Sequence, residues 1–408
     1  MPGFTFLEGR SGRLLGWDAA TDERLATLNL SLPSYLGQVG CRTFIPDTVN
    51  PSITKQMNIH ADFIRDDVPY LQMGFGGFYT STSGEVNSGA VRNISAAIEF
   101  PLGTIQRVTW GGSASLALAD GADKVLSDPI YPPVPYVNWP RSAQIWERVY
   151  QDCSAGIVFS SSYKAYGLLL DRTHSSNAAV DGTMDPAYAG GSLGGNPFVP
   201  YCLVGPTTRA SVVQVHDSRG NGGTMTSNST PFTGELQGAF SAQFGFLDLS
   251  RGTQQAEQLA TGGMAKRRAY LVHASHGIVG AGVNDMISNA RTAVPVAGYR
   301  QTIIGFAPNL KWLETTIAPQ TTSTDSWATV ANQTVTSINA ERVLFNQRVR
   351  AGNAGFVGFL DIADILESAR NSGFWKAPGV TGDGLHPVNA GYALCDSGVD
   401  TSRVQPAR

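Results

Sequence analysis

Three short strings in the second half of the chain hold the residue types that acyl transfer requires. Residues 215–220 read Val-His-Asp-Ser-Arg-Gly, residues 282–285 read Gly-Val-Asn-Asp, and residues 383–387 read Asp-Gly-Leu-His-Pro. A serine hydroxyl becomes a nucleophile when an imidazole takes its proton, and a carboxylate orients that imidazole. Because Asp383 precedes His386 by three residues, one short loop could aim both groups at Ser218. The strings therefore predict a serine nucleophile with an acid–histidine pair.

Such a reaction also needs hydrogen-bond donors for the oxyanion that forms, each worth roughly 10²–10³ in rate. Asn284 offers a side-chain amide, and the backbone N–H of Ser218 offers a second donor. Gly252, in the loop after a predicted strand, offers an unhindered backbone N–H, with Gly245 as the fallback. We predict an oxyanion hole formed by Ser218, Gly252 and Asn284.

Each of these residues also has a structural explanation. An Asp-Ser pair in a loop is often a helix cap, an Asn-Asp pair is often a turn, and a turn role for Gly252 is about as well supported as a donor role. His273 and His276 lie three apart, but no third ligand is in view, which favours a helix-end or surface position over a metal pair. We expect no metal and no cofactor.

The elements that must position these residues alternate between strand and helix from about residue 208. Strands are predicted at 211–215, 244–249, 277–281, 312–317 and 356–362, with helical stretches at 254–273 and 338–349. This alternation predicts a parallel sheet with helices on both faces, where ligands bind beyond the carboxyl ends of the strands. Ser218 and Asn284 both follow such ends.

The first 200 residues have a different pattern. Short apolar or alternating runs, such as 70–75, 94–100, 105–110 and 156–159, are separated by Pro- and Gly-rich turns, which predicts a β-sandwich of jelly-roll type. The Gly-rich segment 187–200 lacks a Gly-Lys-Ser/Thr ending, which favours a linker or surface loop over a phosphate site. We predict a β-rich accessory domain over 1–205, with glycan binding as one role for it, and a hydrolase domain over 206–408. The aromatic stretch 131–139 could stack on sugars, although packing is favoured.

Composition excludes several classes of function. The chain has 408 residues, a net charge of −3 and only 15% charged residues, so nothing indicates binding to nucleic acid or to an anionic membrane. No run approaches the ~20 apolar residues of a membrane span, and residues 1–5 do not begin a signal peptide. An extracellular or virion-associated location is expected, with a cytoplasmic one still open. Four cysteines without C-x-x-C spacing leave disulfide pairing open.

The strings together resemble the SGNH, or GDSL-like, serine hydrolase superfamily, over about residues 208–396. Asp217-Ser218 is similar to the first block of that family, Gly252 to the second, Gly282-x-Asn284-Asp285 to the third, and Asp383-x-x-His386 to the last. The resemblance implies a flavodoxin-like α/β/α domain and a serine esterase mechanism without a metal.

Two residues depart from that pattern. His216 stands where the family usually has glycine, and Arg219 where it usually has an aliphatic residue. A packing role is favoured for His216 over that of a second base. Arg219 and Arg251 are candidate contacts to a polar or anionic acyl substrate, with a solvent-facing position as the alternative for Arg219.

The leading hypothesis is an esterase that removes O-acyl groups, above all O-acetyl groups, from a carbohydrate. A β-sandwich joined to an SGNH-like domain resembles two-domain carbohydrate acetylesterases. The alternatives are a lipase-like short-chain acyl esterase, and a phage tail or surface adhesin with a degenerate hydrolase domain. The expected partner is an acylated carbohydrate or a small ester, and the oligomeric state is open.

Overall fold

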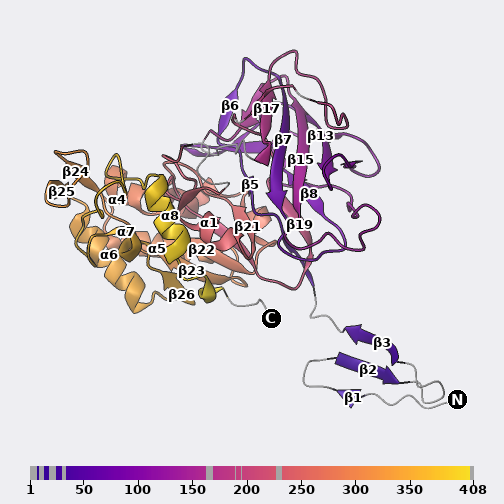
Figure 1. The fold of residues 1–408 in the computed structure, drawn as a ribbon. Helices are drawn as coiled ribbons and strands as arrows, with labels where there is room; N and C mark the ends of the chain where they lie inside the picture. Colours follow the sequence, from indigo (N-terminus) through magenta and orange to yellow (C-terminus); the bar gives the residue numbers. More distant parts are fainter. Residues whose placement is uncertain are drawn as a thin grey trace.

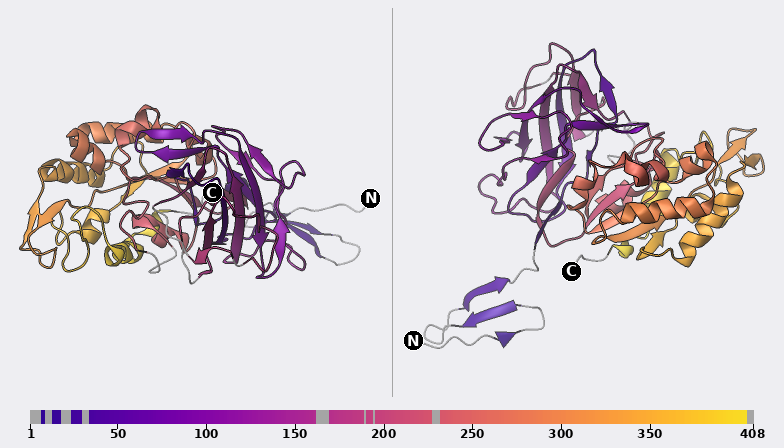
Figure 2. Two further views of the ribbon diagram at one scale, coloured as in Figure 1. Left: turned by 90° about the horizontal axis from the view of Figure 1, so that it is seen from above. Right: turned by 180° about the vertical axis from the view of Figure 1, so that it is seen from behind.

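The computed structural model describes residues 34–161, 169–188, 190–192, 195–226 and 232–404, and the backbone of 7–8, 13–17, 24–29 and 193. Residues 1–6 and, within the Gly-rich segment, Ala189 and Gly194 lie outside the described residues. An antiparallel β part and an α/β part lie side by side, and the three-stranded sheet β1–β3 lies apart from both (Figures 1 and 2).

A six-stranded parallel sheet forms the centre of the α/β part, with the strand order β26-β23-β22-β20-β21-β5. Its strands are β5 (Thr43–Phe44), β20 (Ser211–Val215), β21 (Gly245–Asp248), β22 (His276–Val279), β23 (Lys311–Thr315) and β26 (Gly358–Leu360). Without β5, this is the strand order of flavodoxin-like sheets. The predicted parallel α/β architecture is confirmed.

Helices cover both faces of this sheet because successive strand residues point to opposite sides. Val213 and Leu247 pack in one buried cluster with residues of α3 and α5, whereas Val212 and Phe246 pack in another with residues of α1, α7 and α8. The helical segments are α1 (Gly234–Ser241), α2 (Ala256–Gln258), the π-helical η2 (Leu259–Gly263), α3 (Arg268–Leu271), α4 (Val283–Asn289), α5 (Ala293–Ile304), α6 (Asn339–Ala351), α7 (Ile362–Leu366), α8 (Asn389–Gly398) and the 3₁₀ turn η3 (Thr401–Arg403).

Two antiparallel sheets make up most of the β part (Figure 1). The seven-stranded sheet contains β7 (Lys55–Phe63), β11 (Arg92–Glu99), β12 (Ile105–Arg107), β13 (Leu116–Leu118), β15 (Gln144–Asp152), β17 (Arg172–Ser175) and β18 (Ser192–Leu193). The four-stranded sheet contains β4 (Tyr35–Gln38), β8 (Gln72–Phe75), β14 (Val125–Leu126) and β19 (Cys202–Thr207). The jelly-roll topology and the division of the chain at residue 205 stay predictions.

Short pairs of strands complete the structure. They are β6 (Thr48–Asn50) with β16 (Ile157–Phe159), β9 (Phe78–Ser81) with β10 (Gly84–Asn87), and β24 (Thr321–Ser323) with β25 (Gln333–Val335). The separate sheet holds β1 (Leu7–Glu8), β2 (Arg13–Trp17) and β3 (Arg24–Asn29).

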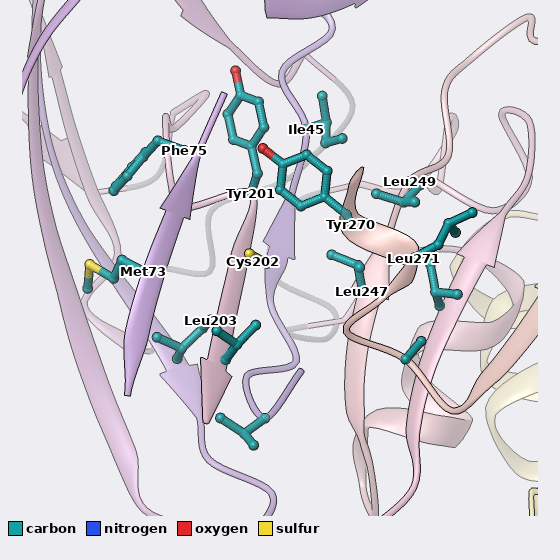
Figure 3. Close-up of a cluster of buried hydrophobic side chains, with 14 of the residues drawn as sticks. Ile45, Met73, Phe75, Tyr201, Cys202, Leu203, Leu247, Leu249, Tyr270 and Leu271 are labelled. Atoms are coloured by element: carbon teal, nitrogen blue, oxygen red, sulfur yellow. The ribbon is translucent and has the colours of Figure 1, made fainter. Parts of the chain in front are cut away.

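The β part and the α/β part share one hydrophobic core. Figure 3 shows Tyr201 of the β part beside Tyr270 of the α/β part, with ring centroids 6.0 Å apart. Phe75 of the β part and Leu247 of the α/β part belong to the same buried cluster. A buried ion pair between Arg267 and Glu85, with Nε and Oε1 3.0 Å apart, crosses the same boundary. These contacts fix the α/β part against the antiparallel sheets.

Three details differ from the sequence-based expectations. Within the Gly-rich segment, residues 192–193 form β18, which pairs with β17 and so does not act as a free linker. The helical stretch 254–273 is interrupted at Gly262, whose φ of 127° is incompatible with a helix. His273 lies just after the end of α3, as expected, but it is buried, with Nδ1 2.7 Å from the Leu36 carbonyl. His276 is not at a helix end or at the surface, because it is the buried first residue of β22.

The described part of the chain shows no disulfide, no metal-binding cluster and no membrane-spanning helix. Its four cysteines are buried free thiols, and it contains no group of three His, Cys, Asp or Glu side chains placed to hold a metal ion. None of its helices combines the length and apolarity needed to cross a membrane.

The packing between β22 and β23 is tight enough to test. A Cβ at Gly277 would overlap the indole ring of Trp312, so we expect Gly277→Ala to lower the free energy of unfolding by about 1–3 kcal/mol through overpacking. A Cβ at Gly298 in α5 would have no neighbouring atom within 4 Å, so Gly298→Ala should instead stabilise the helix by roughly 0.5–1 kcal/mol. Urea unfolding measures both. Equal effects of the two variants would contradict the close packing at Gly277.

Candidate active site

Ser218 lies in a tight turn just beyond the carboxyl end of β20. The turn is closed by the Gly220 N–H, which donates to the Asp217 carbonyl at 3.0 Å, and by the Gly223 N–H, which donates to the Ser218 carbonyl at 2.8 Å. The Asp217 side chain also accepts from the Arg219 N–H at 3.0 Å. Because β20 is buried in the middle of the sheet, this turn presents the serine at the edge where parallel sheets place their ligand sites.

Asp383 and His386 lie in the loop before α8, as the sequence predicted. His386 Nε2 is 2.8 Å from Ser218 Oγ, and His386 Nδ1 is 2.7 Å from Asp383 Oδ2. Gly384 permits this loop because its φ is 73° and a Cβ there would overlap the Thr321 carbonyl. The structure therefore brings the three predicted residues into one hydrogen-bonded line.

The Asp383 carboxylate is held in its ionised form. Burial would raise its pKa, but hydrogen bonds from the His386 ring and from the backbone N–H groups of His386 and Leu385 outweigh burial and hold the pKa below its ordinary value. An ionised carboxylate on Nδ1 fixes the His386 tautomer that leaves Nε2 free to accept the serine proton. This arrangement can activate a hydroxyl near neutral pH.

Two of the three predicted oxyanion donors, Gly252 and Asn284, lie at one loop, residues 250–254. Asn284, in the first turn of α4, donates one Nδ2 hydrogen to the Gln254 carbonyl at 3.0 Å, which leaves the second hydrogen for a ligand. With its amide oriented so that both ends find partners, Asn221 accepts from the Gly252 N–H at 2.9 Å and donates to the Ser218 carbonyl at 3.0 Å. Asn221 thereby links Gly252 to the nucleophile turn. The catalytic roles of Gly252 and Asn284 stay predictions.

The fallback glycine, Gly245, lies at the wrong end of the sheet. It begins β21 and pairs in register with Ser211, the first residue of β20, whereas Ser218 follows the last. A Cβ at Gly245 would overlap the Gln38 carbonyl, so the glycine is explained by packing against β4.

Arg219 is not placed as the expected substrate contact. It is 2% exposed, and its guanidinium donates to the carbonyls of Leu385 at 3.0 Å, Ala318 at 3.1 Å and Pro319 at 2.9 Å. It also lies over the Trp375 ring, whose Nε1–H donates to the Gly384 carbonyl. The residue after the nucleophile therefore holds the loop that carries the histidine.

Arg251 also makes its contacts within the protein. Its Nη1 donates to the Gly252 carbonyl and to Thr253 Oγ1, the latter at 2.8 Å, and its Nε donates to the Thr80 carbonyl at 3.5 Å. Thr253 has a φ of 63°, which is unfavourable for a β-branched residue. Arg251 thus stabilises a strained turn beside Gly252, and its contact to a substrate stays a prediction.

Three neighbours of the site were missed by sequence reasoning. Asn221 links two predicted donors, and Gly223 leaves open space, because a Cβ there would lie 3.3 Å from Ser218 Cβ and 3.8 Å from His386 Cδ2. The Asn-Gly-Gly run directly after the serine string was the available signal. Trp327 packs on Gly384 and donates from Nε1 to Thr321 Oγ1 at 2.9 Å. No signal in the sequence pointed to this residue.

The Arg219 contacts predict a large loss on substitution. Arg219→Leu, which restores the aliphatic type usual in the resembled family, would leave three carbonyls without their donor, each at about 1–3 kcal/mol. We expect the free energy of unfolding to fall by about 3 kcal/mol or more in urea titrations. The exposed Arg348 serves as the matched control, since Arg348→Leu should stay within about 0.5 kcal/mol of wild type. An Arg219→Leu variant whose free energy of unfolding stays near that of wild type would contradict the stabilising role of these three contacts.

Comparisons with known proteins find only distant similarities. No protein-family model and no curated protein matches the chain. Similar solved structures include a GDSL-like lipase from Bacteroides thetaiotaomicron, with 16% identity over 46% of this chain and 84% of that chain and a TM-score of 0.35. A carbohydrate acetylesterase from Sinorhizobium meliloti is 13% identical over 46% of this chain and 96% of that chain, with a TM-score of 0.33. A salicylyl-acyltransferase from a tetracycline biosynthetic pathway covers 84% of this chain and 79% of its own at 11% identity, with a TM-score of 0.31. These similarities are too distant to establish a function for this chain.

Proposed function

We propose that the protein is a serine esterase that hydrolyses O-acyl esters through an acyl-enzyme. The observation that supports this most strongly is the hydrogen-bonded line from Ser218 Oγ through His386 to Asp383, with separations of 2.8 and 2.7 Å. A nucleophile, a base within hydrogen-bonding reach and a carboxylate that orients the base are the three parts of this chemistry.

In the first half of the reaction, Ser218 Oγ attacks the ester carbonyl while its proton passes to His386 Nε2. The tetrahedral intermediate collapses, His386 returns that proton to the departing alcohol, and an acyl group remains on Ser218. In the second half, His386 takes a proton from water as the water oxygen attacks the acyl carbonyl. The tetrahedral intermediate then collapses with cleavage of the Ser218 ester bond, His386 returns the proton to Ser218 Oγ, and the carboxylic acid leaves. Asp383 stays ionised throughout and stabilises the imidazolium of both steps.

The oxyanion would be bound by the backbone N–H of Ser218, the free hydrogen of Asn284 Nδ2 and the backbone N–H of Gly252. Asn284 is preorganised, because its other hydrogen is fixed on Gln254. The Gly252 N–H faces Asn221 and would have to be shared with or released from that side chain. Donors fixed before the reaction stabilise the developing charge without reorganisation.

For the substrate we propose an O-acetylated carbohydrate. The β part of the chain carries an exposed aromatic loop, in which Tyr131 is 59% and Tyr136 39% exposed, whereas Trp139 is buried. Exposed tyrosine rings with apolar faces and a polar hydroxyl suit the stacking of sugar rings. An accessory β-rich region that holds a glycan while the serine site removes acetyl groups fits these features.

Ser218→Ala should lower turnover of an activated acetyl ester by about 10⁴-fold or more, because the remaining groups no longer form a covalent intermediate. Release of acetate from acetylated polysaccharides, measured in parallel, should fall by the same factor. Ser397→Ala removes an exposed hydroxyl in α8 and serves as the control with unchanged rates. Equal turnover by wild type and Ser218→Ala would refute the esterase, and an inactive wild type that binds glycan would favour the adhesin alternative.

The double variant Tyr131→Ala, Tyr136→Ala tests the carbohydrate substrate. We expect KM for an acetylated polysaccharide to rise by about tenfold, since each stacked aromatic contact contributes about 0.5–1.5 kcal/mol. Turnover of the small activated ester should be unchanged. Leu344→Ala, at an exposed apolar residue of α6, is the control. An unchanged KM together with a preference for longer acyl chains would support the short-chain acyl esterase instead.

A further inference from the structure

A cluster of buried charges lies beneath the nucleophile turn and takes no part in the proposed reaction. His216, two residues before Ser218, has its Nδ1 3.1 Å from Asp217 Oδ1 and its Nε2 3.5 Å from Glu235 Oε2. The side chains of these three residues are 2%, 0% and 2% exposed. Glu235 belongs to α1, so the cluster joins that helix to the turn that carries the serine.

The fold leaves a defined space for the His216 ring. A Cβ at Gly280, just beyond β22, would overlap the ring at Nε2 and Cδ2, and a Cβ at Gly220 would overlap His216 Cβ. The imidazole therefore occupies volume that two glycines leave empty. Close packing of this kind fixes both the position and the orientation of the ring.

The charge balance of the cluster favours the imidazolium. A neutral imidazole carries one N–H and no net charge, whereas the imidazolium carries an N–H on both nitrogens and attracts both carboxylates. The contact of Nε2 with Glu235 is an ion pair without a hydrogen bond. Burial lowers the pKa of His216, but the charges of Asp217 and Glu235, 3.1 and 3.5 Å from the ring nitrogens, outweigh burial and raise the pKa to about 9. One contact opposes this, since the Asp217 N–H lies 2.8 Å from Nδ1 and suits an unprotonated nitrogen.

Other titratable or charged groups face the cluster from the neighbouring elements. Asp248 at the end of β21 has its pKa raised by burial and lowered by His216 among others, and Arg219 lowers the pKa of Asp217. Tyr392 of α8 lies near the Glu235 carboxylate, and burial together with that carboxylate raises the pKa of Tyr392. Two further positive charges interact with Asp217. The Arg219 guanidinium is engaged by three carbonyls, and that of Arg300 in α5 donates to the Gly280 carbonyl at 2.8 Å.

We propose that His216 is a positioning residue that, as a buried imidazolium, ties the nucleophile turn to α1 through Asp217 and Glu235 and so holds Ser218 within reach of His386. A second contact runs in parallel, because the Glu235 N–H donates to the Arg219 carbonyl at 3.1 Å. The turn is thus held on both sides of the serine. A misplacement of about 1 Å in such a turn can cost roughly 10²-fold in rate. The activity part of this inference rests on the proposed esterase function, and the stability part does not.

The sign of the pH effect follows from the raised pKa. His216 contributes its full stability below the ordinary histidine value of 6.5, and this contribution is lost as the pH rises through about 9. Between these values the unfolding equilibrium constant should rise by up to about tenfold per pH unit from this group alone. His216→Gln should remove that dependence. His276→Gln is the control, since burial lowers the pKa of His276 to about 4 and the residue is neutral throughout this range.

The experiment is urea unfolding of wild type, His216→Gln, Glu235→Gln and His276→Gln from pH 6 to pH 10, with kcat and KM for an activated acetyl ester at pH 7. We expect His216→Gln to lose the pH dependence and about tenfold or more in kcat with KM little changed. Glu235→Gln should start its loss of stability at lower pH, because one of the two carboxylates that raise the His216 pKa is gone. It also carries the test if His216→Gln does not fold.

The same pH dependence in His216→Gln as in wild type, or an unchanged kcat, would overturn the inference. An enzyme whose wild type shows no turnover would refute the proposed function alone. In that case the unfolding curves, which need no substrate, still decide whether the imidazolium ties the turn to α1.

Discussion

The hydrogen bond between Ser218 and His386 joins two loops that are 168 residues apart in the sequence, and most features of the α/β part serve to keep it short. Neither loop is held by its own secondary structure at this point, because one follows a strand and the other precedes a helix. Their separation must nevertheless stay within hydrogen-bonding distance, or the histidine cannot take the serine proton. The surrounding contacts therefore serve to keep Ser218 Oγ and His386 Nε2 within hydrogen-bonding distance.

Those supports act from three directions. Arg219 reaches from the nucleophile turn to the Leu385 carbonyl inside the histidine loop. The β24–β25 pair holds the same loop from outside, since the Thr321 N–H donates to the Gly384 carbonyl at 2.9 Å. Thr224 Oγ1 donates to the Pro387 carbonyl at 2.6 Å, so the chain after the serine is bonded to the chain after the histidine. Each support is a hydrogen bond to a backbone carbonyl, and of the three donors only Arg219 is charged.

The fold and the reacting groups could be predicted from the sequence to different depths. Alternating apolar strands and helices predicted the parallel sheet, and the Asp383-x-x-His386 spacing predicted that both groups share a loop. The contacts around these groups could not be predicted. Every residue has a backbone carbonyl, so the sequence does not show which carbonyls accept hydrogen bonds from side chains. Arg219 looked like a substrate contact since its partners, the carbonyls of Ala318, Pro319 and Leu385, carry no side-chain signature. Asn221 was missed for the same reason, as its partners are the backbone atoms of Ser218 and Gly252.

His216 shows how a departure from a family pattern is accommodated. In place of a small residue beside the nucleophile, this chain has a large one, and the volume is recovered at Gly220 and Gly280, which lie on other sides of the ring. The exchange also changes the electrostatics, because an imidazole placed between Asp217 and Glu235 gives these buried carboxylates a cation that glycine could not supply. Burying either carboxylate alone would cost several kcal/mol. His216 and the two glycines therefore depend on one another: a side chain at either glycine would overlap His216, and the loss of His216 would leave Asp217 and Glu235 without the imidazolium between them.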